Sequence, residues 1–155
     1  MIIKAEYLNH FVSKTKEIFS EMFEVDLHRT EIQAKNEDVP RHFFSGVVGF
    51  SGNLQGIFSL SIDEEFAQWC TASLQEKETF TPQEIADTIR NLTHQVGSTA
   101  LERFAEHKLT MGFPLVLSGD NVEVYHPQSA EPICVSFSST RGQLSIEFEL
   151  AEAIG

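Results

Sequence analysis

Three polar side chains recur at nearly one-turn spacing in the segment that follows Pro82. Asp87, Asn91 and His94 would lie on one side of a helix, with about 5 to 6 Å between neighbours. They offer a carboxylate, a carboxamide and an imidazole, which exchanges protons near neutral pH. The three side chains of such a row can contact one partner together. The row can equally be an ordinary solvated face.

The helix that would carry this row has a clear beginning. Thr81-Pro82-Gln83-Glu84 combines an N-cap threonine, a proline in the first helical position and a glutamate that completes a capping box. The pattern predicts a helix to about Lys108, roughly 40 Å long, with a bend near Gly97-Ser98. Apolar residues at helical spacing form the side opposite the row: Ile85, Ile89, Leu92, Val96, Ala100 and Phe104. The row is therefore expected to point toward solvent.

No other pattern in the chain competes with this row. There is no Gly-x-Ser-x-Gly elbow, no Gly-rich phosphate loop with its lysine and no His-Glu-x-x-His. The six histidines lack neighbours at metal-ligand spacing, so we expect no bound metal. Cys70 and Cys134 are interpreted as small buried hydrophobes. We interpret Asp63-Glu64-Glu65 as helix capping, and Glu147 and Glu149 as residues that keep a strand soluble.

The remaining patterns predict the elements around this helix. Helical spacing covers residues 3–23 and 63–74, and Gly46, Gly49 and Gly56 mark bulges or close backbone approaches. The predicted strands are an edge or half-exposed strand at 26–34, a hairpin over 43–62 that turns at 51–53, and strands at 113–117, 122–125, 133–138 and 144–150. This order predicts an α+β fold, an antiparallel β sheet with long α helices packed on it. Residues 1–155 are expected to form a single domain.

The charge of the chain limits its partners. Its 155 residues include 11 Lys and Arg against 23 Asp and Glu, a formal net charge of −12. The electrostatic field of this negative charge repels nucleic acid and anionic lipid. No apolar run approaches the roughly 18 residues of a spanning helix, and residues 1–6 show no leader pattern. We expect a cytoplasmic chain without nucleic-acid or membrane contacts, whose partner offers a basic patch and associates in a salt-dependent way.

Three segments together are characteristic: Gly49-Phe50-Ser51-Gly52-Asn53-Leu54-Gln55-Gly56, the helix from Glu84 onward, and Phe113-Pro114-Leu115-Val116-Leu117-Ser118-Gly119. They resemble the chemotaxis phosphatase family of the CheC, CheX and FliY type, and most closely its CheX branch. The resemblance implies an α+β domain that hydrolyses the aspartyl phosphate of a phosphorylated CheY-type response regulator. It also implies that Mg²⁺ belongs to the regulator and that this chain binds no cofactor.

The family's active helix carries Asp or Ser, three spacers, Glu, two spacers and Asn. On this chain the frame falls on Asp87, Asn91 and His94, so the first position agrees while Glu becomes Asn91 and Asn becomes His94. A frame registered on the later Gly97 would instead place Arg90 and Thr93 at the pair. The resemblance implies that the family's Asn holds the attacking water and its Glu engages a regulator lysine. The usual catalytic pair is therefore absent.

Two interpretations of function remain, and a small-ligand sensor on the far face of the sheet is a third. In the first, Asn91 and His94, helped by Asp87, position a water molecule for attack on the aspartyl phosphate. In the second, the domain is a non-catalytic regulator-binding or dimerisation module. Residues expected to contact the partner are Gln95, Ser98 and Pro114. The alternating C-terminal strand at 143–150 suggests a homodimer through sheet edges.

Overall fold

The computed structural model describes residues 5–34, 42–102, 108–119 and 133–152. Its helices are α1 (Ala5–Phe23), α2 (Glu64–Gln75) and α3 (Pro82–Leu101). Its strands are β1 (His28–Ala34), β2 (Phe44–Ser51), β3 (Leu54–Ile62), β4 (Thr110–Met111), β5 (Leu115–Ser118), β6 (Ile133–Ser138) and β7 (Gln143–Glu152). Each of these elements corresponds to a predicted one, apart from the short β4. The predicted strand at 122–125 lies outside the described residues.

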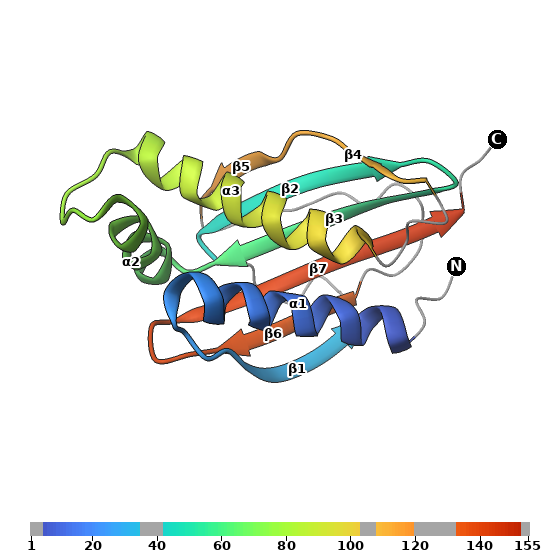
Figure 1. Ribbon diagram of the computed structural model, residues 1–155, viewed down its shortest axis with the longest axis horizontal. Coiled ribbons are helices and arrows are strands. Elements are labelled where there is room, and N and C mark those ends of the chain that lie inside the picture. The colour runs from blue at the N-terminus through green and yellow to red at the C-terminus, as the bar shows by residue number, and fades with distance from the viewer. Residues whose placement is uncertain (1–4, 35–41, 103–107, 120–132, 153–155) are drawn as a thin grey trace.

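The strands form one antiparallel sheet in the order β1-β6-β7-β3-β2-β4, and β5 also pairs with β2. Helices α1 and α3 lie side by side over one face of this sheet, and α2 packs beside α3 at one end (Figure 1). This is the predicted α+β arrangement. Strand β1 lies at an edge, as its polar sequence suggests. We call the side of the sheet opposite α1 and α3 the far face.

Strand β7 lies in the centre of the sheet, between β3 and β6. The predicted dimer contact through this strand is therefore wrong, because both of its edges already have strand partners. Glu147 and Glu149, which we expected to face solvent, are 4% and 1% exposed. Apolar and polar residues alternate along β7 because they lie on opposite faces of the sheet. Both faces are buried at this strand, and only the face toward the helices is apolar.

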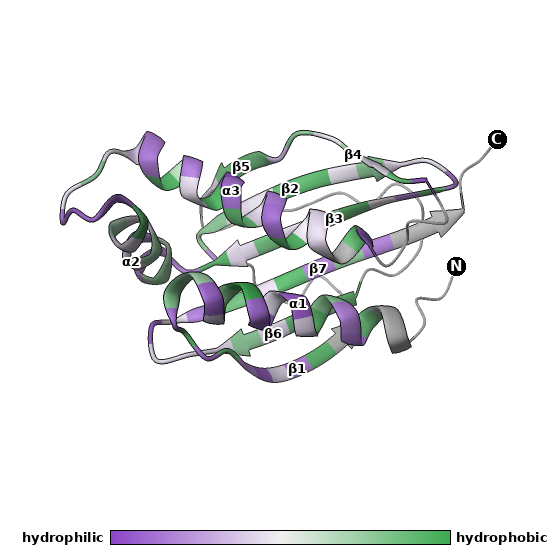
Figure 2. Ribbon diagram, viewed as in Figure 1, coloured by the Kyte–Doolittle hydropathy of each residue, from purple (hydrophilic) through white to green (hydrophobic). Residues whose placement is uncertain are grey.

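Phenylalanine side chains fill the layer between the helices and the sheet. Phe11 of α1 stacks on Phe148 of β7, with ring centroids 4.5 Å apart, and on Phe58 of β3, at 5.9 Å. All three rings are fully buried, so they contribute large apolar area and favourable ring geometry. Figure 2 shows hydrophilic residues on the outward sides of α1 and α3. The abundance of phenylalanine thus serves the core.

Asp63 joins α2 to the start of β7. One of its carboxylate oxygens accepts a hydrogen bond from the Phe66 amide at 2.8 Å, which makes Asp63 the N-cap of α2. Its other oxygen accepts from the Gln143 amide at 2.6 Å. Gly142 leaves room for this contact, because a Cβ there would lie 2.5 Å from the Asp63 carboxylate. The predicted capping is confirmed, and the link to β7 is additional.

Helix α3 ends at Leu101, well before the predicted end at Lys108. Lys108 has a left-handed backbone conformation, with φ of 53°, which an α-helix does not continue. The helix is unbroken through Gly97. There the absence of a side chain allows close packing, since a Cβ would lie 3.2 Å from the Met111 sulfur and 3.5 Å from the Phe58 ring.

Helix α3 and strand β2 approach each other closely at Thr93 and Gly46. A Cβ at Gly46 would overlap the Thr93 hydroxyl and lie 2.9 Å from the Thr93 Cβ. The register between β2 and β3 continues without a shift through this position. Of the two predicted reasons for a glycine here, the close approach is confirmed and the bulge is wrong.

Candidate functional site

The N-terminus of α3 is built as the sequence predicts. The Thr81 hydroxyl accepts a hydrogen bond from the Glu84 amide at 3.2 Å, and the Thr81 amide donates to the Glu84 carboxylate at 3.0 Å. These two bonds form the capping box. Lys77 lies 2.6 Å from the Glu84 carboxylate. Its hydrogen bond, followed by that of the Thr81 amide, lowers the pKa of Glu84.

Burial of one side of α3 determines which residues face solvent. Four apolar residues at helical spacing are at most 8% exposed: Ile85, Ile89, Leu92 and Val96. They pack in the hydrophobic core together with residues of β2, β3 and β7. Because this side is fixed against the sheet, the rotation of α3 about its axis is fixed as well.

The polar row lies on the opposite side of α3. Asp87, Asn91 and His94 are all exposed, and so is Gln95, while Ser98 is partly buried. The orientation predicted from the helical pattern is therefore confirmed. What each side chain can do depends on the hydrogen bonds that it already makes.

Asp87 is engaged along the surface of its own helix. One of its carboxylate oxygens accepts hydrogen bonds from the Gln83 side chain at 3.0 Å and from the Arg90 guanidinium at 2.8 Å. Arg90 thus sets a positive charge beside the first residue of the row. We did not predict this partner, although a spacing of three residues between opposite charges on a helix favours such a pair.

The Asn91 carboxamide is oriented by Gln95. The Gln95 amide nitrogen donates a hydrogen bond to the Asn91 side-chain oxygen at 3.2 Å. This bond leaves the Asn91 side-chain nitrogen as the group that can donate to an incoming ligand. Ser98 donates its hydroxyl proton to the Gln95 backbone oxygen at 3.4 Å, so its remaining capacity toward a partner is as an acceptor.

His94 differs from its neighbours in the row. Within the described part of the chain, no hydrogen bond or ion pair engages its side chain. The imidazole therefore keeps one nitrogen to accept a proton and one to donate. Between Asn91 and His94, the surface of α3 offers a fixed donor beside a group that can take up a proton.

The alternative frame on Arg90 and Thr93 does not form a site. Thr93 is 0% exposed, and its hydroxyl donates to the Ile89 backbone oxygen at 2.7 Å. A residue that is buried against Gly46 cannot contact a partner or a water molecule at the surface. The exposed frame on Asp87, Asn91 and His94 is the one that the fold presents.

Pro114, the third residue expected to contact a partner, is buried. Its side chain packs inside, so it does not form part of an accessible surface. The next residues are different, because Phe113 is 94% exposed, Leu115 67% and Leu117 38%. We missed this apolar surface, although the lack of any charged residue from Leu109 to Gly119 was a signal for it.

Among the residues that the structure describes, no three or more His, Cys, Asp or Glu side chains gather closely enough to hold a metal ion. No helix in the described ranges is both long and apolar enough to cross a membrane. Cys70 and Cys134 are buried and are not joined, as predicted. Burial, reinforced by the negative charge of Asp63, raises the pKa of the Cys70 thiol far above its ordinary value, which makes it unreactive.

The model of one protein family matches the chain. That family is described as chemotaxis phosphatase CheX, and the match covers residues 44–138. The matched segment begins with β2, includes the whole of α3 and ends with β6. No curated protein matches the chain.

Several solved structures share the fold. The chemotaxis protein CheX from Vibrio vulnificus is 25% identical, with 94% of this chain and 99% of that chain covered and a TM-score of 0.84. A CheC-like protein from Shewanella is 21% identical, with 96% and 99% covered and a TM-score of 0.85. CheX from Borrelia burgdorferi, crystallised as a complex with CheY, BeF3 and Mg²⁺, is 16% identical, with 96% and 100% covered and a TM-score of 0.80.

Proposed function

Because the chain belongs to the chemotaxis phosphatase CheX family, we propose that the outward face of α3 docks on a phosphorylated CheY-type response regulator. The observation that carries the proposal is the pair of Asn91 and His94, which the buried side of α3 holds at the surface. The Borrelia burgdorferi complex of CheX with CheY supports this class of partner. In this proposal the regulator supplies Mg²⁺, the chain binds no cofactor, and both proteins are cytoplasmic.

The proposed reaction is hydrolysis of the aspartyl phosphate. A water oxygen bonds to phosphorus, the bond to the aspartyl oxygen breaks, and the phosphoryl group leaves as inorganic phosphate. A ring nitrogen of His94 accepts a proton of the water, and the Asn91 side-chain nitrogen donates a hydrogen bond to the water or to a phosphoryl oxygen. Gln95 holds Asn91 for this role. Asp87 stays paired with Arg90, and it contributes to hydrolysis only through this ion pair.

A second candidate function is docking without hydrolysis. It is favoured by the hydrogen bonds that already engage the Asp87 carboxylate and the Asn91 side-chain oxygen, because these bonds occupy oxygen atoms that could otherwise hold the attacking water. The family's glutamate and asparagine are both replaced at these positions. The domain would then bind the regulator, while the phosphate decays at its own rate.

We also propose that two copies of the chain associate through β5. This strand pairs with β2 on one side, so its other edge is available for pairing in the described structure. Leu115 and Leu117 are paired with Val47 and Ser45, whose side chains lie on the far face. Two copies repel each other through their net charge of −12, but the segment around β5 carries no charge.

The test of the proposed function measures decay of a phosphorylated CheY-type regulator with and without the domain. We expect faster decay with the natural chain, and a loss of about a hundredfold in that acceleration with His94→Ala, because a proton acceptor contributes at least that much. Asn91→Ala should also reduce it. Calorimetry of the complex is recorded for each variant, so that loss of binding is separated from loss of hydrolysis.

Two further variants sharpen this test. Ser20→Ala changes an exposed position on α1 and should leave both binding and decay unchanged. Asn91→Glu combined with His94→Asn restores the family's pair in the exposed frame, and decay should accelerate beyond that with the natural chain. Binding with unchanged decay supports the second candidate. The proposal is overturned if no variant, including the restored pair, binds the regulator.

A further inference from the structure

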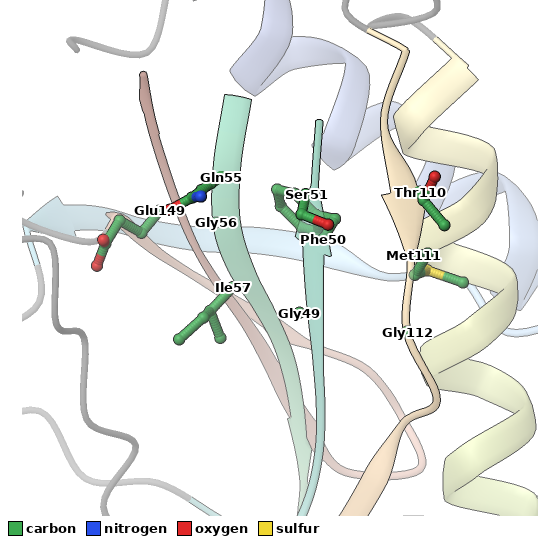
Figure 3. A pocket seen from close by; sticks show the side chains of 10 residues that line it. All are labelled: Gly49, Phe50, Ser51, Gln55, Gly56, Ile57, Thr110, Met111, Gly112 and Glu149. Carbon is green, nitrogen blue, oxygen red and sulfur yellow. The ribbon is translucent and has the colours of Figure 1, made fainter. Parts of the chain in front are cut away.

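A pocket of about 430 Å³ lies at the end of the sheet where β2 turns into β3. Gly49, Ile57 and Glu149 are register partners on three adjacent strands, so they lie in one row across the far face. Figure 3 shows the Ile57 and Glu149 side chains on the same side of their strands, with Thr110 and Met111 beyond Gly49. The volume lies within the range of small-molecule sites.

Gly49 keeps this pocket open, and the described structure gives no packing reason for a glycine there. A Cβ at Gly49 would meet only the Gly56 oxygen, at 3.8 Å, among the described atoms. At Gly46 and Gly97, by contrast, a Cβ would press on Thr93 and Met111. Glycine weakens a strand interior and often marks a position where a ligand approaches the backbone. The open floor at Gly49 fits that second explanation.

The lining determines which ligands fit. Ile57 offers an apolar contact, Gln55 and Thr110 are polar, and the described lining contains the carboxylate of Glu149 but no Lys, Arg or His. Glu149 is 1% exposed, and a carboxylate in such surroundings interacts strongly with a positive charge. The net charge of −12 also attracts cations and repels anions.

We propose that this pocket binds a small organic cation, in which a protonated amine is joined to a short apolar body. The amine contacts Glu149, and the apolar body packs over Gly49 against Ile57. Glu149 also has an interaction within the protein, which the ligand adds to or replaces. The pocket opens on the far face, whereas the Asn91 and His94 row lies on α3 over the other face. Ligand binding is therefore independent of the proposed docking on a regulator.

The test uses tyramine as the cationic probe, with its uncharged alcohol analogue tyrosol and the anion 4-hydroxyphenylacetate as comparisons. Backbone amide spectra of the ¹⁵N-labelled full chain are recorded during each titration. We expect tyramine at millimolar concentration to shift the amide signals of Gly49, Gly56 and Gly112. Affinity for tyrosol and for the anion should be at least about tenfold lower, because each lacks the amine charge.

Variants separate filling of the pocket from loss of the fold. Gly49→Val fills the floor with a residue that favours strands and should abolish the tyramine shifts. Val47→Ile, on the same strand and face but outside the pocket lining, should leave them unchanged. Glu149→Gln should reduce affinity about tenfold. Equal shifts with the anion, persistence of binding in Gly49→Val, or no glycine shift with tyramine would each overturn the proposal.

Discussion

At the scale of single residues, burial decides what each polar group does. Asp87, Asn91 and His94 lie on the exposed side of α3, where the bonds of Asp87 and Asn91 join them only to residues of the same helix. Thr93, one position before His94, is buried, and its hydroxyl donates a hydrogen bond to the helix backbone. His42 shows how burial also changes the pKa of a titratable side chain. Desolvation by burial lowers the pKa of His42 below its ordinary 6.5, and the negative charge of Asp63 acts in the opposite direction.

The lowered pKa of His42 predicts how stability depends on pH. Below pH 6.5 the unfolded chain binds a proton at His42 more readily than the folded chain does. The contribution of neutral His42 to the free energy of unfolding is therefore fully present above pH 6.5, and it falls as the pH decreases. His42→Gln should flatten the decline of the unfolding free energy in this window. Urea unfolding of both proteins between pH 8 and pH 5 measures the effect.

Glu84, the other group with a lowered pKa, does not interfere with that measurement. Its pKa lies below its ordinary 4.5, so its contribution to stability is present above pH 4.5 and is lost only as the pH falls further. The pH windows of His42 and Glu84 are therefore separate.

The control for the His42 experiment is the dependence of the unfolding free energy on urea concentration. Equal dependence for the natural chain and His42→Gln confirms that they unfold to the same extent. Parallel pH profiles for the natural chain and His42→Gln would contradict the role assigned to His42.

At the scale of elements, the close approach of α3 to β2 sets the position of the whole polar row. The capping box fixes where the helix begins, and the apolar side of the helix fixes its rotation. Its distance from the sheet depends on Gly46, which faces the Thr93 side chain. A larger residue at position 46 must push α3 away from the sheet, together with Asn91 and His94.

Gly46→Ala should therefore lower the free energy of unfolding by about 3 kcal/mol, the upper range for overpacking in a core. Thr93→Ala removes the overlapping hydroxyl and should restore part of that loss when the two changes are combined, so the two effects are not additive. Urea unfolding of the single and double variants gives the coupling. Gly49→Ala, on the same strand, has room for its Cβ and should leave stability unchanged or slightly higher. A similar loss at both glycines would contradict this explanation.

At the scale of the whole molecule, the order of the strands decides which surfaces remain for association. Strand β7 is central and unavailable, and the sheet ends at β1 on one side and at β4 and β5 on the other. Strand β1 is polar, whereas Phe113, Leu115 and Leu117 form an exposed apolar surface at the other end. An acidic chain can approach its own copy most easily at such an uncharged segment.

Sedimentation of the full chain tests the proposed dimer. We expect the natural chain to sediment as a dimer, and Leu115→Glu to raise its dissociation constant more than about tenfold, because the change sets like charges against each other in an apolar contact. Leu74→Glu introduces the same charge at another exposed leucine, which is 38% exposed on α2, and should leave the dimer intact. A natural chain that is monomeric at all concentrations would exclude this interface.

Several features could be predicted because neighbouring residues encode them. The capping box at Thr81, the polar row of α3, the hairpin turn at 51–53 and the α+β order all follow from patterns within one element or its flanks. Such signals are readable because propensity, capping and periodicity act over only a few residues. The exposed frame of Asp87, Asn91 and His94 was therefore predictable.

Which strands are neighbours and which surfaces are buried depends on contacts between segments far apart in the chain. The alternation of β7 is the same for an edge strand and for a central one, so its sequence could not place Glu147 and Glu149 inside. The burial of Pro114 also depended on contacts with distant segments. Long-range pairing and packing are shared properties of residues far apart in the chain, and no local pattern contains them.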